Sequence, residues 1–253
     1  MLSKAKIKQI KSLEYKKFRD ESGLFVAEGE KSVCEILQSN LEIDSLFCLS
    51  DALLYNDNKH NIKAEIISEN EMKRISFLKT PPTAFVVAKI PDKKININDI
   101  NNSLNIILDD IQDPGNLGTI IRLCDWFGIQ NIICSHKTAD CFSPKTVQAT
   151  MGAICRVNVF YVQLNDFFDT LGKNINVYGT FLEGENIYSA KLSPQGLIIM
   201  GNEGKGISSE TEKHVTQKLC IPCLSDNATK TESLNVSVAA AIVCSEFKRR
   251  NFV

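Results

Sequence analysis

Residues 108–129 read Leu-Asp-Asp-Ile-Gln-Asp-Pro-Gly-Asn-Leu-Gly-Thr-Ile-Ile-Arg-Leu-Cys-Asp-Trp-Phe-Gly-Ile. This segment predicts the end of an apolar strand, a turn and an amphipathic helix. The strand is indicated by three consecutive apolar side chains within residues 105–108. Asp113-Pro114-Gly115-Asn116 predicts the turn, because proline fixes its own φ and glycine tolerates positive φ. Gly128 is the expected helix stop. The apolar positions recur at helical spacing and are Leu117, Ile120, Ile121, Cys124 and Phe127.

This segment also has the features of a ligand site. A strand that leads through a Gly/Asn turn into a helix N-terminus offers free backbone N–H groups at the carboxyl edge of a sheet. Many connections of this kind serve packing alone, so both interpretations stay open. Thr119, Arg122 and Asp125 lie off the apolar stripe of the helix.

The composition is that of a globular protein with one large domain or two ordinary ones. The chain has 253 residues, of which 43% are hydrophobic and 23% charged. No segment approaches the roughly 18 uninterrupted apolar residues of a membrane span, and the lysine-rich N-terminus has no cleavable signal peptide. We therefore expect a cytoplasmic protein with no membrane partner, and its nine cysteines should be reduced.

Basic residues gather at the N-terminus although the net charge is only −1. Between Lys4 and Arg19 a single acid, Glu14, accompanies seven basic residues. Such a face can neutralise phosphates, or it can simply be a solvated helix surface. The candidate phosphate contacts are Lys8, Lys11, Lys17 and Arg19.

The pair Cys220 and Cys223 has the C-x-x-C form. No second pair with metal-ligand spacing accompanies it, and it does not open a helix as a thioredoxin-type site would. No metal site is predicted.

Two domains are predicted, at residues 1–92 and 104–253, with a polar linker at 93–103. The first should contain a basic helix (4–19), strands at 23–29, 45–49, 65–67 and 83–90, a helix at 30–38, and a short helix opened by the capping-box pattern Ser68-x-x-Glu71. In the second, strands at 105–109, 131–134, 155–161, 175–181, 197–200 and 218–221 alternate with helices at 116–127, 144–151, 165–171, 207–216 and 233–249. This alternation predicts parallel strands joined by crossover helices, an α/β fold.

Two further segments have polar or glycine-rich residues beside apolar runs. Residues 201–206, Gly-Asn-Glu-Gly-Lys-Gly, follow the strand at 197–200 but lack the spacing of a P-loop or a Rossmann turn. The helix at 233–249 is apolar on nearly all sides, so it should be buried or pack against a second subunit. Ser233, Asn235 and Ser237 at its start should cap the helix or face a ligand.

Taken together, residues 113–122, 200–207 and 221–239 resemble the motifs of the SpoU (TrmH) branch of the SPOUT RNA methyltransferases. The first ninety residues resemble the small α/β substrate-binding domain that precedes the catalytic domain in many members, through Lys17-Phe18-Arg19 and the segment from Gly23 to Gly29. That domain is similar to ribosomal proteins that bind bent RNA. The resemblance implies a parallel-sheet domain with a deep trefoil knot, a homodimer, and S-adenosylmethionine as cofactor.

The resemblance also implies roles for individual residues. Catalysis would involve Arg122, Asn116, Glu203 and Asn235, and the cofactor would contact Gly201, Ile221, Leu234, Thr180 and Ser233. The stretch from Ile221 to Leu234 is longer than the family pattern, so the cofactor loop should differ in shape. Lys8, Lys11, Lys17 and Arg19 become candidate RNA contacts.

The implied reaction transfers a methyl group to a ribose 2′-hydroxyl, with 23S ribosomal RNA as the expected substrate. Transfer RNA is the alternative substrate, and a catalytically inactive RNA-binding homologue is the alternative function. A free guanidinium, with a pKa above ~12, is a poor base. Arg122 should therefore hold the ribose and its phosphate and stabilise the developing alkoxide, and the proton acceptor stays open. The alternative role of Arg122 is an i,i+3 pair with Asp125.

Overall fold

The computed structural model describes residues 1–50, 62–172, 175–225 and 233–250. The chain divides into two compact units. Unit 1 consists of Met1–Asp92 together with Asp140–Arg156, and unit 2 consists of Lys93–Ala139 with Val157–Val253. In the part of the chain that the structure describes, no helix is long and apolar enough to cross a membrane.

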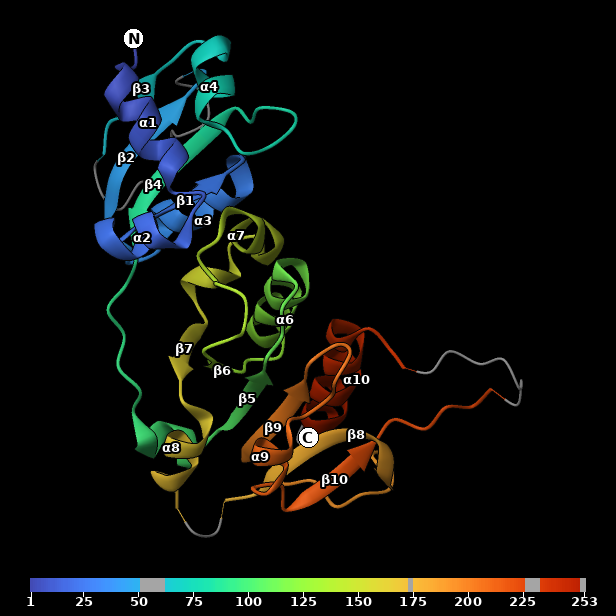
Figure 1. Ribbon diagram of the computed structural model, residues 1–253. Coiled ribbons are helices and arrows are strands. Elements are labelled where there is room, and N and C mark those ends of the chain that lie inside the picture. Colours follow the sequence, from blue (N-terminus) through green and yellow to red (C-terminus); the bar gives the residue numbers. More distant parts are fainter. Residues whose placement is uncertain (51–61, 173–174, 226–232, 251–253) are drawn as a thin grey trace. The chain divides into compact units, whose positions relative to one another are not determined.

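Unit 1 is built on a sheet with the strand order β1-β4-β2-β3 (Figure 1). β4 runs antiparallel to both β1 and β2, and β3 runs parallel to β2. The strands are β1 (Leu24–Glu28), β2 (Ile43–Cys48), β3 (Glu65–Ile66) and β4 (Ala84–Lys89), and the helices are α1 (Lys4–Ser12), α2 (Lys16–Ser22), α3 (Glu30–Gln38), α4 (Glu69–Ile75) and α7 (Pro144–Thr150), with the 3-10 turn η2 (Ala153–Cys155).

Both faces of this sheet are buried, which explains why β1 reads as a continuous apolar run. Phe25 and Ala27 face one apolar cluster with residues of α3 and α7, whereas Leu24 and Val26 face another with residues of α1 and α4. Successive side chains of a strand point to opposite faces. Helices therefore cover the sheet on both sides, and the capping box predicted at Ser68 and Glu71 is present at the start of α4.

Unit 1 differs from the prediction in two places. The basic segment 4–19 forms two helices, with Leu13 buried in the core between them. The sequence places residues 140–156 in the second domain, yet they cluster with unit 1, where Val147 is buried against the sheet. Sequence periodicity identified the helix at 144–151 but carries no information on which sheet the helix covers.

Unit 2 contains an entirely parallel sheet in the order β10-β8-β9-β5-β6-β7. Its strands are β5 (Leu104–Asp109), β6 (Asn131–Ser135), β7 (Asn158–Val162), β8 (Val177–Asn186), β9 (Gly196–Gly201) and β10 (Gln217–Cys220). Its helices are α5 (Ile97–Asn101), α6 (Pro114–Trp126), α8 (Leu164–Asp169), α9 (Ser209–Glu212) and α10 (Val236–Arg249). The prediction of an α/β fold with a parallel sheet is confirmed.

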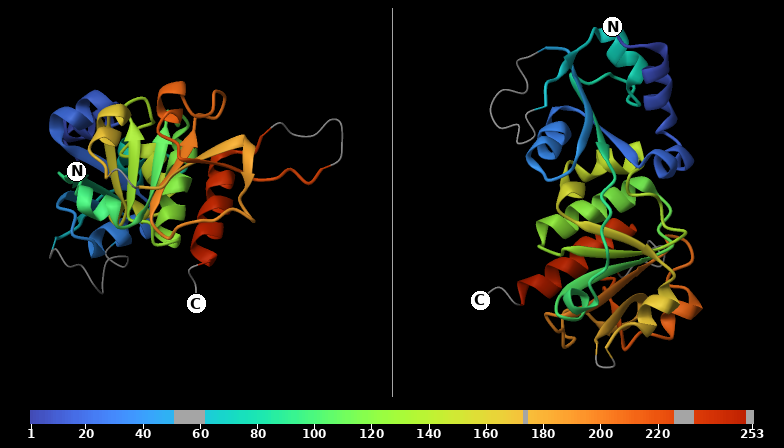
Figure 2. Two further views of the ribbon diagram at one scale, coloured as in Figure 1. Left: turned by 90° about the horizontal axis from the view of Figure 1, so that it is seen from below. Right: turned by 90° about the vertical axis from the view of Figure 1, so that its left-hand side faces the viewer.

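Helices lie on both faces of this sheet. α5 and α8 share an apolar cluster with Ile107, Ile133 and Ile199 of the strands. α6 and α10 pack against each other on the opposite face (Figure 2). The predicted linker 93–103 includes α5, and Ile100 of this helix is fully buried.

Several element boundaries differ from the prediction. α6 begins at Pro114 rather than at residue 116, because Asp113 caps the helix and proline at its first position needs no N–H partner. The helix predicted at 207–216 is only α9, and the strand predicted at 155–161 begins at Asn158 after η2. Gly128 has a φ of 64°, in agreement with the predicted helix stop.

Candidate active site

The site lies where the two central strands of the unit 2 sheet end. β5 and β9 are parallel neighbours, and Asp109 at the end of β5 is paired with Gly201 at the end of β9. Since parallel strands bring their carboxyl ends to one edge, the two following loops meet there. The Asn202 side-chain Nδ2 donates to the Asp110 carbonyl at 2.7 Å, and the Ser208 backbone N–H donates to Asp109 Oδ2 at 2.8 Å.

Glu203 connects the glycine-rich loop to the start of α6. Its Oε1 accepts a hydrogen bond from Asn116 Nδ2 at 3.0 Å. The backbone N–H groups of Gln112 and Asp113 also point at this carboxylate, each at 3.4 Å. Burial raises the pKa of Glu203, but hydrogen bonds from Asn116 and from backbone N–H groups outweigh it and leave that pKa below its ordinary value.

Asn235 brings the start of α10 to the same place. Its Oδ1 caps this helix by accepting from the Ser237 N–H at 2.9 Å, and its Nδ2 donates to Asn116 Oδ1 at 3.0 Å. Asn235 is therefore the cap of α10, and its side chain also contacts Asn116. Three predicted catalytic residues, Asn116, Glu203 and Asn235, form one hydrogen-bonded chain.

Asn116 lies in the first turn of α6 but does not cap it. The cap is Asp113, whose carboxylate accepts the Asn116 N–H at 2.9 Å. The Asn116 side chain is therefore free of helix capping, and its donor and acceptor are fixed in direction by Glu203 and Asn235. This side chain is the central member of the polar chain.

Arg122 lies two turns further along α6 and has an exposed side chain. Among the described residues, neither a hydrogen bond nor an ion pair involves its guanidinium, so the alternative pair with Asp125 is not formed. The structure does not join Arg122 to the Asn116 chain. It leaves a charged group on the helix surface that is available to an external ligand.

The predicted cofactor residues have different environments. Thr180 Oγ1 donates to the Ile199 carbonyl at 2.8 Å and so joins β8 to β9. Ile221 is half-buried, whereas Ser233 and Leu234 are exposed. The longer stretch predicted between Ile221 and Leu234 falls in part on residues 226–232, outside the described residues.

Gly201 is required by the loop itself. A Cβ atom at this position would lie 2.3 Å from the backbone atoms Gly206 C and Ile207 N. Asn202 and Gly206 pair through two backbone hydrogen bonds of 2.9 Å, which close the loop over Gly201. The residue is therefore fixed by backbone packing, and this requirement is independent of any cofactor contact.

Asp110 is a residue of this region that the sequence did not single out. Its φ is 61°, unusual for a residue with a side chain. Ser135 Oγ donates to its carboxylate at 2.6 Å, and Lys137 Nζ lies 3.7 Å from it. The only available signal was an acid directly after a buried strand, which also describes many turns.

The candidate RNA contacts of unit 1 fall into two groups. Lys8 and Lys17 are exposed, Lys17 with Glu21 at 3.9 Å. Lys11 Nζ donates to the Ser76 carbonyl at 3.0 Å and lies 4.1 Å from the centroid of the Phe77 ring. Arg19 is only 2% exposed and bonds within unit 1, which corrects its assignment as an RNA contact.

The nine cysteines form no disulfide with one another in the structure. Cys220 Sγ donates to the Leu182 carbonyl at 3.1 Å. Within the residues that the structure describes, no group of His, Cys, Asp or Glu could hold a metal ion.

Comparison with known proteins identifies the class that this fold and site define. Residues 103–245 match the model of the SpoU rRNA Methylase family, and residues 4–85 match the MRM3-like substrate binding domain. The chain belongs to the SpoU rRNA methylase family, which confirms the resemblance carried by the three sequence segments. The family defines an enzyme class, the RNA methyltransferases.

Individual relatives extend over nearly the whole chain. The Bacillus subtilis 23S rRNA (guanosine(2553)-2′-O)-methyltransferase RlmP is 30% identical, and the match covers 94% of each chain. A TrmH-family structure from Porphyromonas gingivalis is 36% identical, with a TM-score of 0.84 and 99% of each chain covered. The AdoMet-bound rRNA methyltransferase from Sinorhizobium meliloti is 28% identical, with a TM-score of 0.84 over 100% of this chain and 97% of that one.

Proposed function

We propose that this protein transfers a methyl group from S-adenosylmethionine to a ribose 2′-hydroxyl of 23S ribosomal RNA. The observation that carries the proposal is the hydrogen-bonded chain of Asn235, Asn116 and Glu203, which draws three separated motifs to one sheet edge. The Bacillus subtilis relative, which spans nearly the same length, acts on 23S rRNA. The match of residues 4–85 to a substrate-binding domain supports RNA as the substrate.

The described residues fit an adenosine-containing cofactor. Leu234, the sequence neighbour of Asn235, is 49% exposed, and Ile221 is half-buried, so both can offer apolar surface to a purine ring. We infer that Gly201, Ile221 and Leu234 hold the cofactor, with Thr180 and Ser233 beside them. S-adenosylmethionine would supply a methyl group activated by a sulfonium sulfur.

The remaining chemistry falls to side chains that position and stabilise. Arg122, exposed and without a partner among the described residues, can bind the phosphate and ribose oxygens of RNA in its planar fork. Such a cation beside the 2′-oxygen stabilises the negative charge that develops as the hydroxyl loses its proton. Asn116 is oriented by Glu203 and Asn235 and is suited to direct the hydroxyl. A phosphate oxygen is one candidate proton acceptor.

We further propose a cytoplasmic homodimer whose catalytic domain contains a trefoil knot. Support for a second subunit comes from large apolar side chains left exposed on the helices that carry the site. Trp126 of α6 is 83% exposed, and Val238 of α10 is 48% exposed. Exposed apolar surface of this kind is typical of protein contacts.

The experiment that tests the proposal combines Arg122→Ala with radiolabelled S-adenosylmethionine. The wild type should label 23S rRNA isolated from a strain that lacks the gene. The variant should lose at least about a hundredfold in transfer rate, as expected when a charge-stabilising group is removed. Its affinity for the cofactor should stay within about twofold, because Arg122 makes no bond to the Asn116 chain. Turnover equal to the wild type would contradict the role of Arg122.

Two further measurements distinguish the proposal from a transfer RNA substrate and from an inactive RNA-binding homologue. Mapping ribose methylation across total RNA of the deletion strain should show one missing methyl group in 23S rRNA, and a loss in transfer RNA would instead identify that substrate. An inactive RNA-binding homologue would fail to bind the labelled cofactor. The presence of Asn116, Arg122, Glu203 and Asn235 in one chain favours the enzyme.

A further inference from the structure

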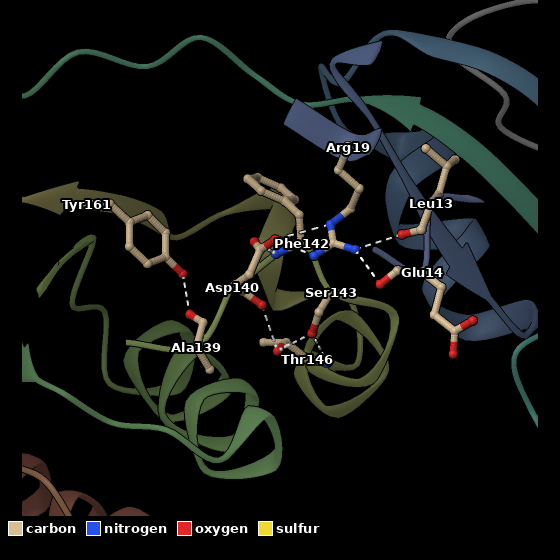
Figure 3. Close-up of polar contacts among 9 residues, drawn as sticks. All are labelled: Leu13, Glu14, Arg19, Ala139, Asp140, Phe142, Ser143, Thr146 and Tyr161. Atoms are coloured by element: carbon tan, nitrogen blue, oxygen red, sulfur yellow. Dashed lines mark hydrogen bonds and ion pairs between the residues drawn. The ribbon is translucent and has the colours of Figure 1, made fainter. Parts of the chain in front are cut away.

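Arg19 is a buried cation with every observed bond inside unit 1. Its Nη1 donates to the carbonyls of Leu13 and Glu14 at 2.7 and 2.8 Å. Its Nε and Nη2 donate to Asp140 Oδ2 at 3.1 and 2.5 Å. Figure 3 shows the guanidinium between the end of the first helix and Asp140. Burying a charge is costly unless it is paired and hydrogen-bonded, so this arrangement requires Asp140.

Asp140 is the first residue of the segment that joins unit 1 from within the methyltransferase sequence. It is itself fixed locally, since its Oδ1 accepts from the Phe142 N–H at 2.9 Å and its carbonyl accepts from Thr146 Oγ1 at 2.9 Å. The last residue of the segment, Arg156, forms an ion pair with Glu35 of α3. An ion pair thus fastens each end of residues 140–156 to the N-terminal domain.

The Asp140 end leads directly into the active-site region. Ala139, joined to Asp140 by a peptide bond, donates its N–H to the Ile111 carbonyl at 2.8 Å. Ile111 precedes Gln112 and Asp113, whose N–H groups face the Glu203 carboxylate. The other end, Arg156, leads into the amino end of β7, at the opposite edge of the sheet. It reaches Ala139 indirectly, through Tyr161 of β7, whose hydroxyl donates to the Ala139 carbonyl at 2.5 Å (Figure 3).

We propose that Arg19 and Asp140 are positioning residues for the active site. Through the Ala139–Ile111 hydrogen bond, they hold the loop between β5 and α6 on which Glu203 and Asn116 are assembled. The expected effect on catalysis rests on the proposed function. The expected effect on the loop does not, so hydrogen exchange can test it whether or not methyl transfer is observed.

The test compares Asp140→Asn with Glu35→Gln in the full-length protein. Both variants weaken an ion pair at one end of the same segment, and both keep the shape of the side chain. In Asp140→Asn, hydrogen exchange at the amides of Gln112, Asp113 and Ala139 should accelerate by about tenfold, because these groups lie on the hydrogen-bonded route. In Glu35→Gln these amides should exchange at the wild-type rate.

Kinetics separates positioning from general destabilisation. For Asp140→Asn we expect kcat for RNA methylation to fall by about tenfold, with KM for RNA and S-adenosylmethionine within about twofold of the wild type. Glu35→Gln should keep the wild-type kcat. If Asp140→Asn does not fold, Arg19→Lys replaces it, since lysine keeps the charge but not the guanidinium fork, and the same changes are expected.

Two results would overturn the inference. One is wild-type exchange at Gln112 and Asp113 in the folded Asp140→Asn or Arg19→Lys variant. The other is equal acceleration in Glu35→Gln, which would show that the whole segment matters rather than its Asp140 end. A wild type that transfers no methyl group to any RNA would instead reject the proposed function, and the exchange measurement would still decide the coupling.

Discussion

Among single residues, Glu203 joins the glycine-rich loop to the start of α6 through its carboxylate. Its carboxylate accepts hydrogen bonds from the Asn116 side chain and from two backbone N–H groups, and its pKa is lowered in consequence although burial opposes this. A carboxyl group with a lowered folded-state pKa stabilises the fold above its unfolded pKa. That stabilisation is lost as the pH falls through the lowered value.

Glu203→Gln should therefore reproduce the effect of acid on this loop at neutral pH. The amide offers one acceptor in place of two oxygens, so Asn116 and the N–H groups of Gln112 and Asp113 lose part of their partner. Because Glu203 is largely exposed, we expect a loss of at most about 1 kcal/mol in unfolding free energy. The rate of methyl transfer should fall by about tenfold or more.

Chemical denaturation from about pH 2 to neutral pH, with kinetics at neutral pH, would measure both effects. The wild type should lose stability from this group only below the ordinary carboxyl range of about 4.3, and the variant should lack that contribution. A variant with wild-type kcat at neutral pH would exclude Glu203 from orienting Asn116.

What the sequence predicts about a residue depends on whether chemistry or burial sets its role. Asn116, Glu203 and Asn235 are predicted site residues from three separate motifs, and the structure brings them together. Arg19 stands in a basic run that resembles an RNA surface, yet it is buried against Asp140, 121 positions away in sequence. A charge pattern cannot reveal a partner at that separation.

Among the loops, the turn at Gly201–Gly206 has the strictest backbone requirement. It closes through two hydrogen bonds between Asn202 and Gly206. Gly201 lies directly beneath this closure, where no Cβ fits, whereas the Gly204 Cβ position has only Asn202 Oδ1 nearby, at 3.8 Å. The two glycines of one loop thus offer a matched comparison.

Gly201→Ala should destabilise the protein by about 1–3 kcal/mol, because the added methyl group meets backbone that cannot move aside. It should also displace Glu203 and so abolish methyl transfer. Gly204→Ala should leave both stability and activity near the wild type. Thermal unfolding and a methyl-transfer assay of the two variants would decide, and equal behaviour of the two would contradict the close approach at Gly201.

Helices and strands were predicted well where apolar periodicity was long, and less well where a cap or a tertiary bond ends them. α6 starts earlier than its apolar stripe because Asp113 and Pro114 begin it. The basic helix ends at Ser12 and resumes at Lys16, and Arg19 satisfies the carbonyls of Leu13 and Glu14 at that break. Neither boundary depends on the hydrophobic pattern.

For the molecule as a whole, the sequence does not show that unit 1 is built from two separate stretches of the chain. The shift from polar to alternating segments near residue 93 marks one boundary, and the units do separate between Asp92 and Lys93. Nothing in residues 140–156 distinguishes them from a crossover between β6 and β7. Their place in unit 1 follows from contacts such as Phe142 with Phe25, whose ring centroids are 4.9 Å apart.

This discontinuity predicts that a mutation inside the methyltransferase sequence will weaken the N-terminal domain. Val147 of α7 is 2% exposed in the apolar cluster of unit 1, and Val177 of β8 is 3% exposed in a cluster of unit 2. Replacing either by alanine removes the same two methyl groups and should cost about 2 kcal/mol. The effects should appear in different units, because each cavity opens in a different core.

Hydrogen exchange on the full-length variants would locate them. Val147→Ala should reduce protection in β1 and β4, which lie about 120 and about 60 residues earlier in sequence. It should leave the β5 and β9 amides protected. Val177→Ala should do the reverse. If Val147→Ala loosened β5 and β9 while β1 and β4 stayed protected, residues 140–156 would belong to the parallel-sheet unit, and the N-terminal domain would be complete within residues 1–92.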